Sequence, residues 1–205
     1  MNREVSAVWS ESGNPLFPSE QVEENSWVAE SQGGDASVFN RLVLKWERTV
    51  YNMASRILQD KDEAAEATQE IFLQAFKNIR RFRRDSLFST WIYRIALNQC
   101  LSRIRCRPPG THFSLDDGNA VSRPAESLRV AGTQDGELIR AENRSRVQAA
   151  LSFLPPDQRV VVELKFFQEL TFEDIAGVLD IPLSTIKSRL YAGLEMLKVR
   201  LGARA

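Results

Sequence analysis

The sequence predicts an all-α protein made of two small helical domains joined by a flexible linker. Apolar residues recur three and four positions apart over long stretches before residue 107 and after residue 141, which is typical of amphipathic helices. Between these stretches, residues 108–140 are rich in Pro, Gly, Asp, Ser and Thr and have no such period. Alternation typical of a β-strand does not occur over any useful length.

The charges of the chain are balanced overall but unevenly distributed. The 205 residues include 27 Lys and Arg and 27 Asp and Glu, so the formal net charge is zero. Residues 1–24 are acidic and polar without periodicity, which predicts a disordered acidic tail. Residues 80–107 contain 8 arginines and one acidic residue. This basic run favours nucleic-acid binding, although a solvated charged surface is the alternative interpretation.

Several functional classes are excluded by what the sequence contains. Long uncharged apolar windows and a secretory signal are absent, so we expect a cytoplasmic protein with no membrane insertion. The single histidine, His112, lies in a loop-like stretch, and Cys100 and Cys106 do not have the spacing of metal ligands. We therefore expect no metal, no cofactor and no enzymatic activity.

The first domain is expected at residues 25–107, with three helices. The first begins at Ala36, the second spans about residues 62–78, and the third ends near residue 105 with Ser89 or Thr90 as its cap. The second helix carries acidic residues on one face. Aromatic residues and arginines alternate between the second and third helices, as in proteins that bind unpaired DNA. The alternative is that most of these aromatic residues belong to the core.

The second domain is expected at residues 141–205 and contains a helix-turn-helix. Thr171, with Asp174 three residues later, predicts the start of one short helix, and Ser184 is expected to cap the next. The second helix would expose Lys187, Ser188 and Tyr191. Two helices joined by a tight turn serve DNA binding in many proteins, and a helical hairpin without a DNA role is the alternative.

Two segments of the chain resemble one known family. Residues 62–105 (DEAAEATQEIFLQAFKNIRRFRRDSLFSTWIYRIALNQCLSRIR) are similar to region 2 of the extracytoplasmic-function sigma factors of bacterial RNA polymerase, within the sigma-70 family. Residues 154–190 (LPPDQRVVVELKFFQELTFEDIAGVLDIPLSTIKSRL) are similar to region 4 of these factors. The two segments occur in the family's order, so the resemblance covers most of the chain outside the tail and the linker.

The resemblance implies a factor that directs transcription initiation, with partners and residues to match. The partners would be core RNA polymerase, through its β′ clamp helices and β flap, promoter DNA, and an anti-sigma factor in a stress or envelope response. Residues at the polymerase-docking positions are Glu63, Glu66, Gln69 and Glu70. Residues at the minus-10 positions are Arg81, Phe82, Arg83, Ser86, Trp91, Arg94 and Asn98, where Phe82, Ser86 and Asn98 would hold a flipped base. Residues at the minus-35 positions are Lys165, Ser184, Thr185, Lys187, Ser188, Arg189 and Tyr191.

Two positions depart from the family pattern. Arg84 stands where the family often has the glycine of an FRGD motif, which changes the loop that reads the minus-10 element. Ala192 and Gly193 follow Tyr191, where the family usually continues with arginines. We expect weaker phosphate contacts there and a minus-35 preference that is not the commonest one. An Ala192→Arg variant should then bind with a changed affinity and salt dependence.

Three other functions remain to be weighed against a sigma factor. A free-standing helix-turn-helix regulator would bind duplex DNA tightly as a dimer, but it needs neither the acidic face nor the basic aromatic segment. A nuclease would need clustered carboxylates or a metal motif, which the sequence lacks. A redox role for the two cysteines is weaker than the interpretation of Cys100 as a buried core thiol and Cys106 as exposed.

Overall fold

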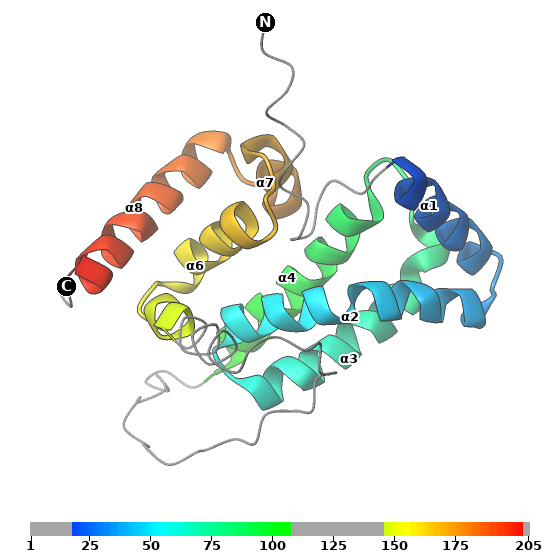
Figure 1. The fold of residues 1–205 in the computed structure, drawn as a ribbon, viewed down its shortest axis with the longest axis horizontal. Helices are drawn as coiled ribbons and strands as arrows, with labels where there is room; N and C mark the ends of the chain where they lie inside the picture. The colour runs from blue at the N-terminus through cyan, green and yellow to red at the C-terminus, as the bar shows by residue number, and fades with distance from the viewer. Residues whose placement is uncertain (1–17, 108–145, 203–205) are drawn as a thin grey trace, which may run out of the picture.

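Two helical bundles make up the part of the chain that the structure describes. The computed structural model describes residues 18–107 and 146–202, and every regular element in them is helical, which confirms the expected fold class (Figure 1). The linker expected at residues 108–140 lies outside the described residues. The first bundle contains α1 (Pro18–Gln32), α2 (Ala36–Leu58), α3 (Lys61–Asn78), the short 3-10 helix η1 (Ile79–Arg81) and α4 (Phe88–Cys106). The second contains a helical segment over residues 146–152, α6 (Pro156–Val162), the π-helical turn η2 (Glu163–Phe167), α7 (Phe172–Leu179) and α8 (Leu183–Gly202).

Helix α1 differs from the sequence prediction. Residues 18–24 were assigned to a disordered tail that ended at residue 24, but they form the first half of α1. Glu24 is buried, accepts a 3.1 Å hydrogen bond from the indole of Trp46 and pairs with Lys45 at 2.9 Å. Because Val28 is also buried, α1 packs against α2 as a part of the bundle. The prediction was wrong because it rested on the acidic composition of the segment. Composition does not show that one carboxylate, Glu24, is buried with two partners.

Side-chain caps define the starts of α2 and α3. Asp35 accepts hydrogen bonds from the backbone N–H groups of the first turn of α2, and Asp60 does the same for α3. Helix α4 has no such cap, since the residue before it is Leu87 and Ser89 lies buried inside the helix. The prediction that Ser89 or Thr90 caps this helix is therefore wrong.

The first helix of the helix-turn-helix begins as its capping residues predict, but the second does not. The Thr171 side chain and the Asp174 carboxylate make reciprocal bonds that complete a capping box at the start of α7. Asp180 adopts a left-handed conformation with φ 53° and ends the helix. Helix α8 begins at Leu183, so Ser184 lies within its first turn, and its prediction as the cap is wrong.

Gly193, inside α8, has a packing reason. A Cβ atom at this position would lie 3.3 Å from Cγ2 of Val162 and 3.5 Å from Cβ of Gln158, both on α6. Since α6 and α8 are in contact along this face, glycine lets the two helices approach closely. The sequence alone shows only the cost of glycine in a helix, about 1 kcal/mol relative to alanine.

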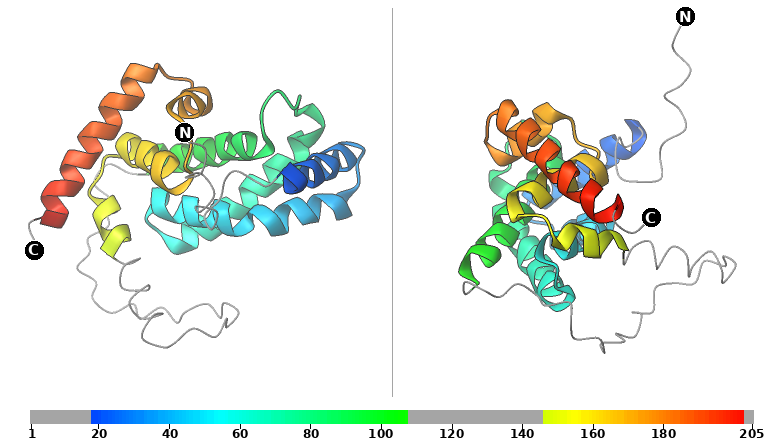
Figure 2. Two further views of the ribbon diagram at one scale, coloured as in Figure 1. Left: turned by 45° about the horizontal axis from the view of Figure 1, so that its top comes forward. Right: turned by 90° about the vertical axis from the view of Figure 1, so that its left-hand side faces the viewer.

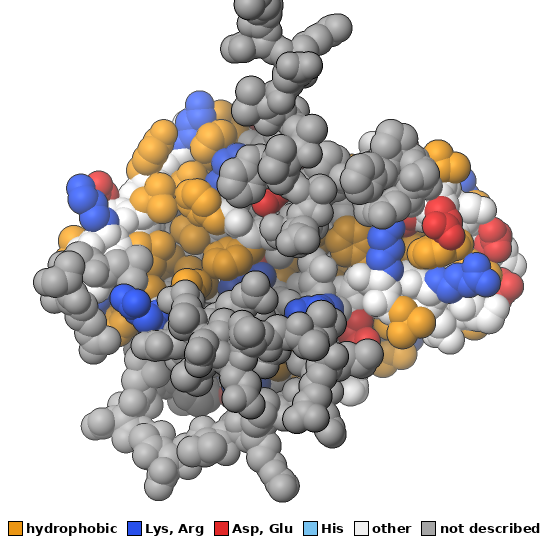
Figure 3. Space-filling model, in the orientation of Figure 1, with side chains coloured by type: hydrophobic (Ala, Val, Ile, Leu, Met, Phe, Trp, Pro, Cys, Tyr) orange, Lys and Arg blue, Asp and Glu red, His pale blue; other side chains and the backbone are white. Residues whose placement is uncertain are grey.

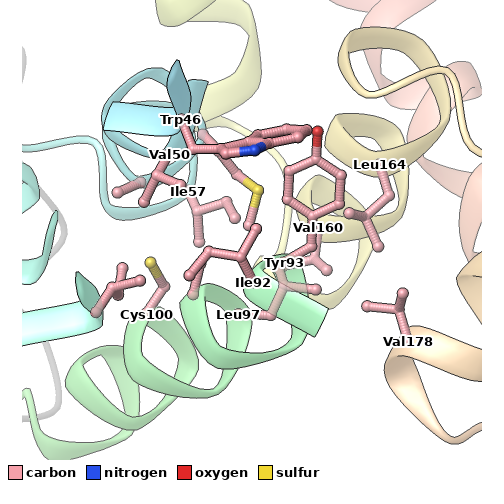
Figure 4. Packing of buried hydrophobic residues seen from close by; sticks show 14 of the residues in the cluster. Trp46, Val50, Ile57, Ile92, Tyr93, Leu97, Cys100, Val160, Leu164 and Val178 are labelled. Atoms are coloured by element: carbon pink, nitrogen blue, oxygen red, sulfur yellow. The ribbon is translucent and has the colours of Figure 1, made fainter. Parts of the chain in front are cut away.

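The two bundles share one hydrophobic core. Figure 4 shows Tyr93 of α4 next to Trp46 of α2 and near Val160 and Leu164 of the second bundle. Helix α4 lies along the boundary, where it contacts both α6 and α7 (Figures 1 and 2). The two predicted domains are therefore packed against each other in this structure.

On the surface, the two halves of the molecule differ in side-chain type. On the face drawn in Figure 3, hydrophobic side chains gather over the α6–α8 half, while acidic and basic side chains are interspersed near α1. Tyr191 and Val199 of α8 and Phe166 of η2 are among the exposed large hydrophobic residues. On this face, the second bundle thus exposes several apolar side chains in addition to those in the shared core.

Candidate functional site

One candidate surface lies on α3 and is acidic. Glu66, Gln69 and Glu70 are exposed on this helix, as the sequence predicts. Arg103 of α4 reaches Glu70 at 2.8 Å and Glu66 at 3.5 Å, and its hydrogen bond lowers the pKa of Glu70 below the usual value. Glu63 is half-buried and pairs with Arg107, the residue after α4, so it is less accessible than the other three.

Glu66, Gln69 and Glu70 form an acidic stripe on α3, and exposed apolar side chains that the sequence did not predict lie next to it. Leu73 and Phe76 of α3 are 58% and 42% exposed. Leu73 follows Glu66, Gln69 and Glu70 at helical spacing, so acidic and apolar groups share one accessible face. Such a mixture suits a protein partner, because exposed apolar side chains gain from burial while the acidic groups select a basic surface.

A second candidate surface lies between α3 and α4 and carries the basic run. Arg81, Arg83 and Ser86 are exposed. Phe82, in contrast, is buried at 8% exposure and stacks on Trp91 with ring centroids 4.9 Å apart. Its ring therefore belongs to the aromatic core in this conformation and is not open to a base.

On α4, the two predicted polar contact residues lie one turn apart. Arg94 and Asn98 are both exposed. Arg94 donates a hydrogen bond to the backbone carbonyl of Gly177 in α7, so it contacts the helix-turn-helix. Asn98 lies farther along the same exposed face of α4.

The third candidate surface is the outer face of α8. Ser184, Lys187, Ser188 and Tyr191 are exposed there, and Thr185 is half-buried. The hydroxyl of Ser188 donates to the carbonyl of Thr185 at 2.9 Å, a local bond that leaves the side chain at the surface. This face carries one cationic group and several hydroxyls, which suits contact with DNA.

Two of the predicted contacts in the second bundle have partners inside the protein. Arg189 pairs with Asp157 of α6 at 2.8 Å and therefore lies against α6, beside the exposed face of α8. Lys165 donates to the carbonyl of Leu170 at 2.9 Å. The ammonium groups of Lys165 and Lys187 lie 5.0 and 5.7 Å from the ring centroid of Phe172, so these two cations face the same aromatic ring.

A buried ion pair joins the two bundles, and the sequence analysis did not find it. Arg56 of α2 binds both carboxylate oxygens of Glu163, with Nε–Oε2 at 2.6 Å and Nη2–Oε1 at 2.8 Å. Glu163 is fully buried at the start of η2 and also accepts a 2.9 Å bond from Gln168. Burial raises the pKa of the Glu163 carboxyl, and Arg56 and Gln168 oppose this by stabilising its charged form. The 107 positions between Arg56 and Glu163 explain why local patterns gave no signal.

Three further hydrogen bonds cross the same interface. Arg159 of α6 donates to the carbonyl of Ile57 at 2.6 Å, and Gln148 donates to the carbonyl of Ser55 at 2.8 Å. The third is the bond from Arg94 to Gly177. Burial lowers the pKa of Arg159 to about 10, so this guanidinium still carries its charge at neutral pH. Carbonyl groups at the C-terminal end of α2 thus accept from one charged and one neutral donor of the second bundle.

The described residues include both cysteines and most of the side chains that could bind a metal ion. Within them, no group of histidine, cysteine and carboxylate side chains is placed to hold a metal ion. Cys100 is buried, which raises its pKa to about 12, whereas Cys106 is exposed. Both cysteines therefore lie as expected. His112 is outside the described residues. None of the described helices is long and apolar enough to cross a membrane.

Comparison with known proteins gives consistent matches over both bundles. The family model for sigma-70 region 2 matches residues 42–108, and the model for sigma-70 region 4 matches residues 144–197. The chain is 31% identical over 180 residues to the RNA polymerase sigma-H factor of Pseudomonas aeruginosa, covering 86% of this chain and 93% of that protein. It is 30% identical over 176 residues to the ECF RNA polymerase sigma factor SigW of Bacillus subtilis, covering 85% and 94% of the two chains.

A solved structure supports the same fold. The sigma factor RpoE from Bartonella quintana, solved in complex with the anti-sigma factor NepR, is similar with a TM-score of 0.58 at 23% identity. The similarity covers 80% of this chain and 96% of that chain.

Proposed function

Because the chain belongs to the extracytoplasmic-function family of sigma-70 factors, we propose a division of labour among its three exposed surfaces. The family binds core RNA polymerase and directs it to promoters. In the proposal, α3 docks on the polymerase, the η1–α4 segment reads the minus-10 element, and α8 reads the minus-35 element. The observation that carries it is the presence of an acidic, partly apolar face on α3 in the same chain as a helix-turn-helix. A free-standing regulator has no use for that face.

The docking proposal rests on the composition of the α3 surface. Glu66, Gln69 and Glu70 offer negative charge and an amide, and Leu73 adds apolar area. A basic, partly apolar partner fits this surface, and the β′ clamp helices are the expected partner. The arginine that faces the stripe, Arg103, fixes the orientation of Glu70 before binding.

The promoter-reading proposal assigns different chemistry to the two bundles. In the first bundle, Arg81 and Arg83 are exposed cations that can follow the phosphates of unpaired DNA, and Asn98 can read a base edge. Phe82 would need to leave its stack on Trp91 before it could hold a flipped base. In the second bundle, Lys187 and its neighbours on α8 would enter the major groove.

The packed arrangement of the two bundles is compatible with this function only if they separate. Elements named for positions 35 and 10 are centred about 25 base pairs apart, or about 85 Å of duplex at 3.4 Å per base pair. In the structure α4 contacts α7, and Arg94 is bound to Gly177. We therefore propose that this conformation is the closed state of the free chain, and that the interface opens on the polymerase.

Regulation and location follow from the same proposal. A sigma factor works where RNA polymerase is, so we propose a cytoplasmic protein without catalytic activity of its own. Because the relative from Bartonella quintana is solved with an anti-sigma factor, we propose that this chain is also held inactive by such a partner, in a stress or envelope response.

Charge reversal on α3 tests the docking surface. Glu66 is 74% exposed in its side chain, so Glu66→Lys should preserve the fold. It should weaken binding to core RNA polymerase by about tenfold or more, because a lysine would face the expected basic partner. Fluorescence titration of labelled protein with purified core enzyme measures the affinity.

The matched control for this variant is Glu47→Lys, which makes the same charge change at an exposed position of α2. It should bind core enzyme within about twofold of the wild type, since isolated surface changes rarely exceed 0.5 kcal/mol. Equal affinities for the two variants would show that α3 is not the docking surface.

A further inference from the structure

The last residue of α1 makes an unusual set of contacts to the segment between α3 and α4. The side-chain nitrogen of Gln32 donates to the carbonyls of Ile79 at 2.9 Å and Phe82 at 2.6 Å. Its side-chain oxygen accepts from Nε of Arg84 at 3.0 Å and from Nη2 at 2.6 Å. A primary amide has two N–H donors and two acceptor lone pairs, so the capacity of this side chain is fully used. Only one amide orientation satisfies two carbonyls and a guanidinium together.

Arg84 adopts a backbone conformation that disfavours a side chain. Its φ is 61°, in the left-handed region that glycine enters without penalty. This is the position at which the family often has glycine in the FRGD motif. An arginine there needs compensation, and its two hydrogen bonds to the oxygen of Gln32 provide it. Arg84, which replaces the glycine of the motif, is therefore directly linked to Gln32, whose hydrogen-bonding groups are all used.

A second contact ties the same segment to the turn between α1 and α2. The guanidinium of Arg80 lies so close to Gly34 that a Cβ atom there would be 2.8 Å from Nη2. Gly34 has φ 103°, which also requires glycine. Thus Arg84 contacts the end of α1 and Arg80 contacts the turn after it. The four arginines from Arg80 to Arg84 are all exposed, but within the described residues only Arg80 and Arg84 have a close contact with α1 or with the turn that follows it.

We propose that Gln32 and Arg84 are positioning residues that set the conformation of the minus-10-reading segment and hence its base preference. This inference rests on the proposed function, which assigns residues 81–86 to that element. Gln32 fixes the backbone at Ile79 and Phe82, on both sides of Arg81, and fixes Arg84 beyond it. The segment therefore already has a fixed conformation before it binds DNA, which reduces the conformational entropy lost on binding.

The test measures transcription from a panel of promoters in which each minus-10 base is varied and the minus-35 element is constant. Gln32→Ala should lower transcription from the preferred promoter by about five- to tenfold, since several hydrogen bonds are lost. It should lower transcription from the other promoters less, so that base preference is flattened. Affinity for core polymerase should stay within about twofold, because α3 is not altered.

Arg84→Gly provides the diagnostic second variant. Glycine adopts the left-handed conformation unaided, so this variant should fold, but it removes the guanidinium bound to Gln32 and should therefore shift the minus-10 base preference. In the Arg84→Gly background, Gln32→Ala should have a smaller effect than in the wild type, because the compensating bonds are no longer needed. Asn40→Ala, an exposed amide on α2, is the control and should change neither activity nor preference.

The outcomes separate this inference from the proposed function. If the wild type shows no preference among the minus-10 variants, the proposed function fails. If the wild type has a preference and Gln32→Ala lowers transcription equally from every promoter, in step with a loss of thermal stability, Gln32 only stabilises the bundle and the inference is overturned. If Gln32→Ala lowers transcription equally in the wild type and in Arg84→Gly, Gln32 and Arg84 do not act together and the inference is also overturned.

Discussion

Replacing Glu163 with alanine should lower the free energy of unfolding by about 3 kcal/mol or more, since breaking a buried ion pair leaves its partner uncompensated. Glu163 is fully buried, and its carboxylate binds Arg56 through two bonds and Gln168 through a third. The variant leaves a guanidinium with 20% side-chain exposure and a buried amide donor without this acceptor. Urea denaturation followed by circular dichroism measures the loss.

A double-mutant cycle assigns this loss to the ion pair. Arg56→Ala and Glu163→Ala should each destabilise the protein, and the double variant should cost about 1–3 kcal/mol less than the sum of the two. Glu47→Ala, an exposed acid on α2, is the control and should change stability by about 0.5 kcal/mol at most. If Glu163→Ala behaves like this control, the pair does not hold the two bundles together.

The structure also predicts different roles for two neighbouring cations of α8. Lys187 is exposed on the outer face, whereas Arg189 pairs with Asp157 of α6. Lys187→Ala should weaken binding to the minus-35 element by about 5- to 150-fold, equivalent to about 1–3 kcal/mol. Arg189→Ala should weaken this binding clearly less, although it also removes one positive charge and lies only two residues from Lys187. Fluorescence anisotropy of the polymerase-bound protein on minus-35 duplexes measures both.

The salt dependence distinguishes how Lys187 acts. A phosphate contact would reduce the slope of log affinity against log salt by about one and weaken all sequences alike. A contact to a base edge would leave the slope unchanged and relax the preference at one position. If Arg189→Ala weakens binding as much as Lys187→Ala does, the Asp157 pair does not persist on DNA and the assignment of faces on α8 is wrong.

The helices were predictable where local patterns determine them. Apolar periodicity locates α2 and α3, and the Thr171–Asp174 capping box locates α7, because these signals act within a few residues. The caps assigned to Ser89 and Ser184 were wrong, since each helix begins one residue or more earlier, at Phe88 and at Leu183. A hydroxyl inside the first turn is indistinguishable in sequence from one at the cap.

The contacts between distant segments could not be predicted. Glu24 and Glu163 have ordinary acidic side chains in the sequence, and only their tertiary partners make them buried. The pairing of Gln32 with Arg84 crosses 52 positions. Gly193 appeared to be a defect of the recognition helix, but it permits close packing against Val162. Helical spacing made the exposure of Glu66, Glu70, Lys187 and Tyr191 predictable, but not the pairing of Glu63 and Arg189 with other helices or their ends.

Run-off transcription with bacterial core RNA polymerase on a randomised promoter library tests the central claim most directly. The account predicts transcripts only when the protein is present, with two shared motifs at a constant spacing upstream of the start. Lys187→Ala should deplete the upstream motif and Gln32→Ala the downstream one. An absence of protein-dependent transcripts, with tight binding of the protein alone to duplex DNA, would contradict the account and indicate a free-standing regulator.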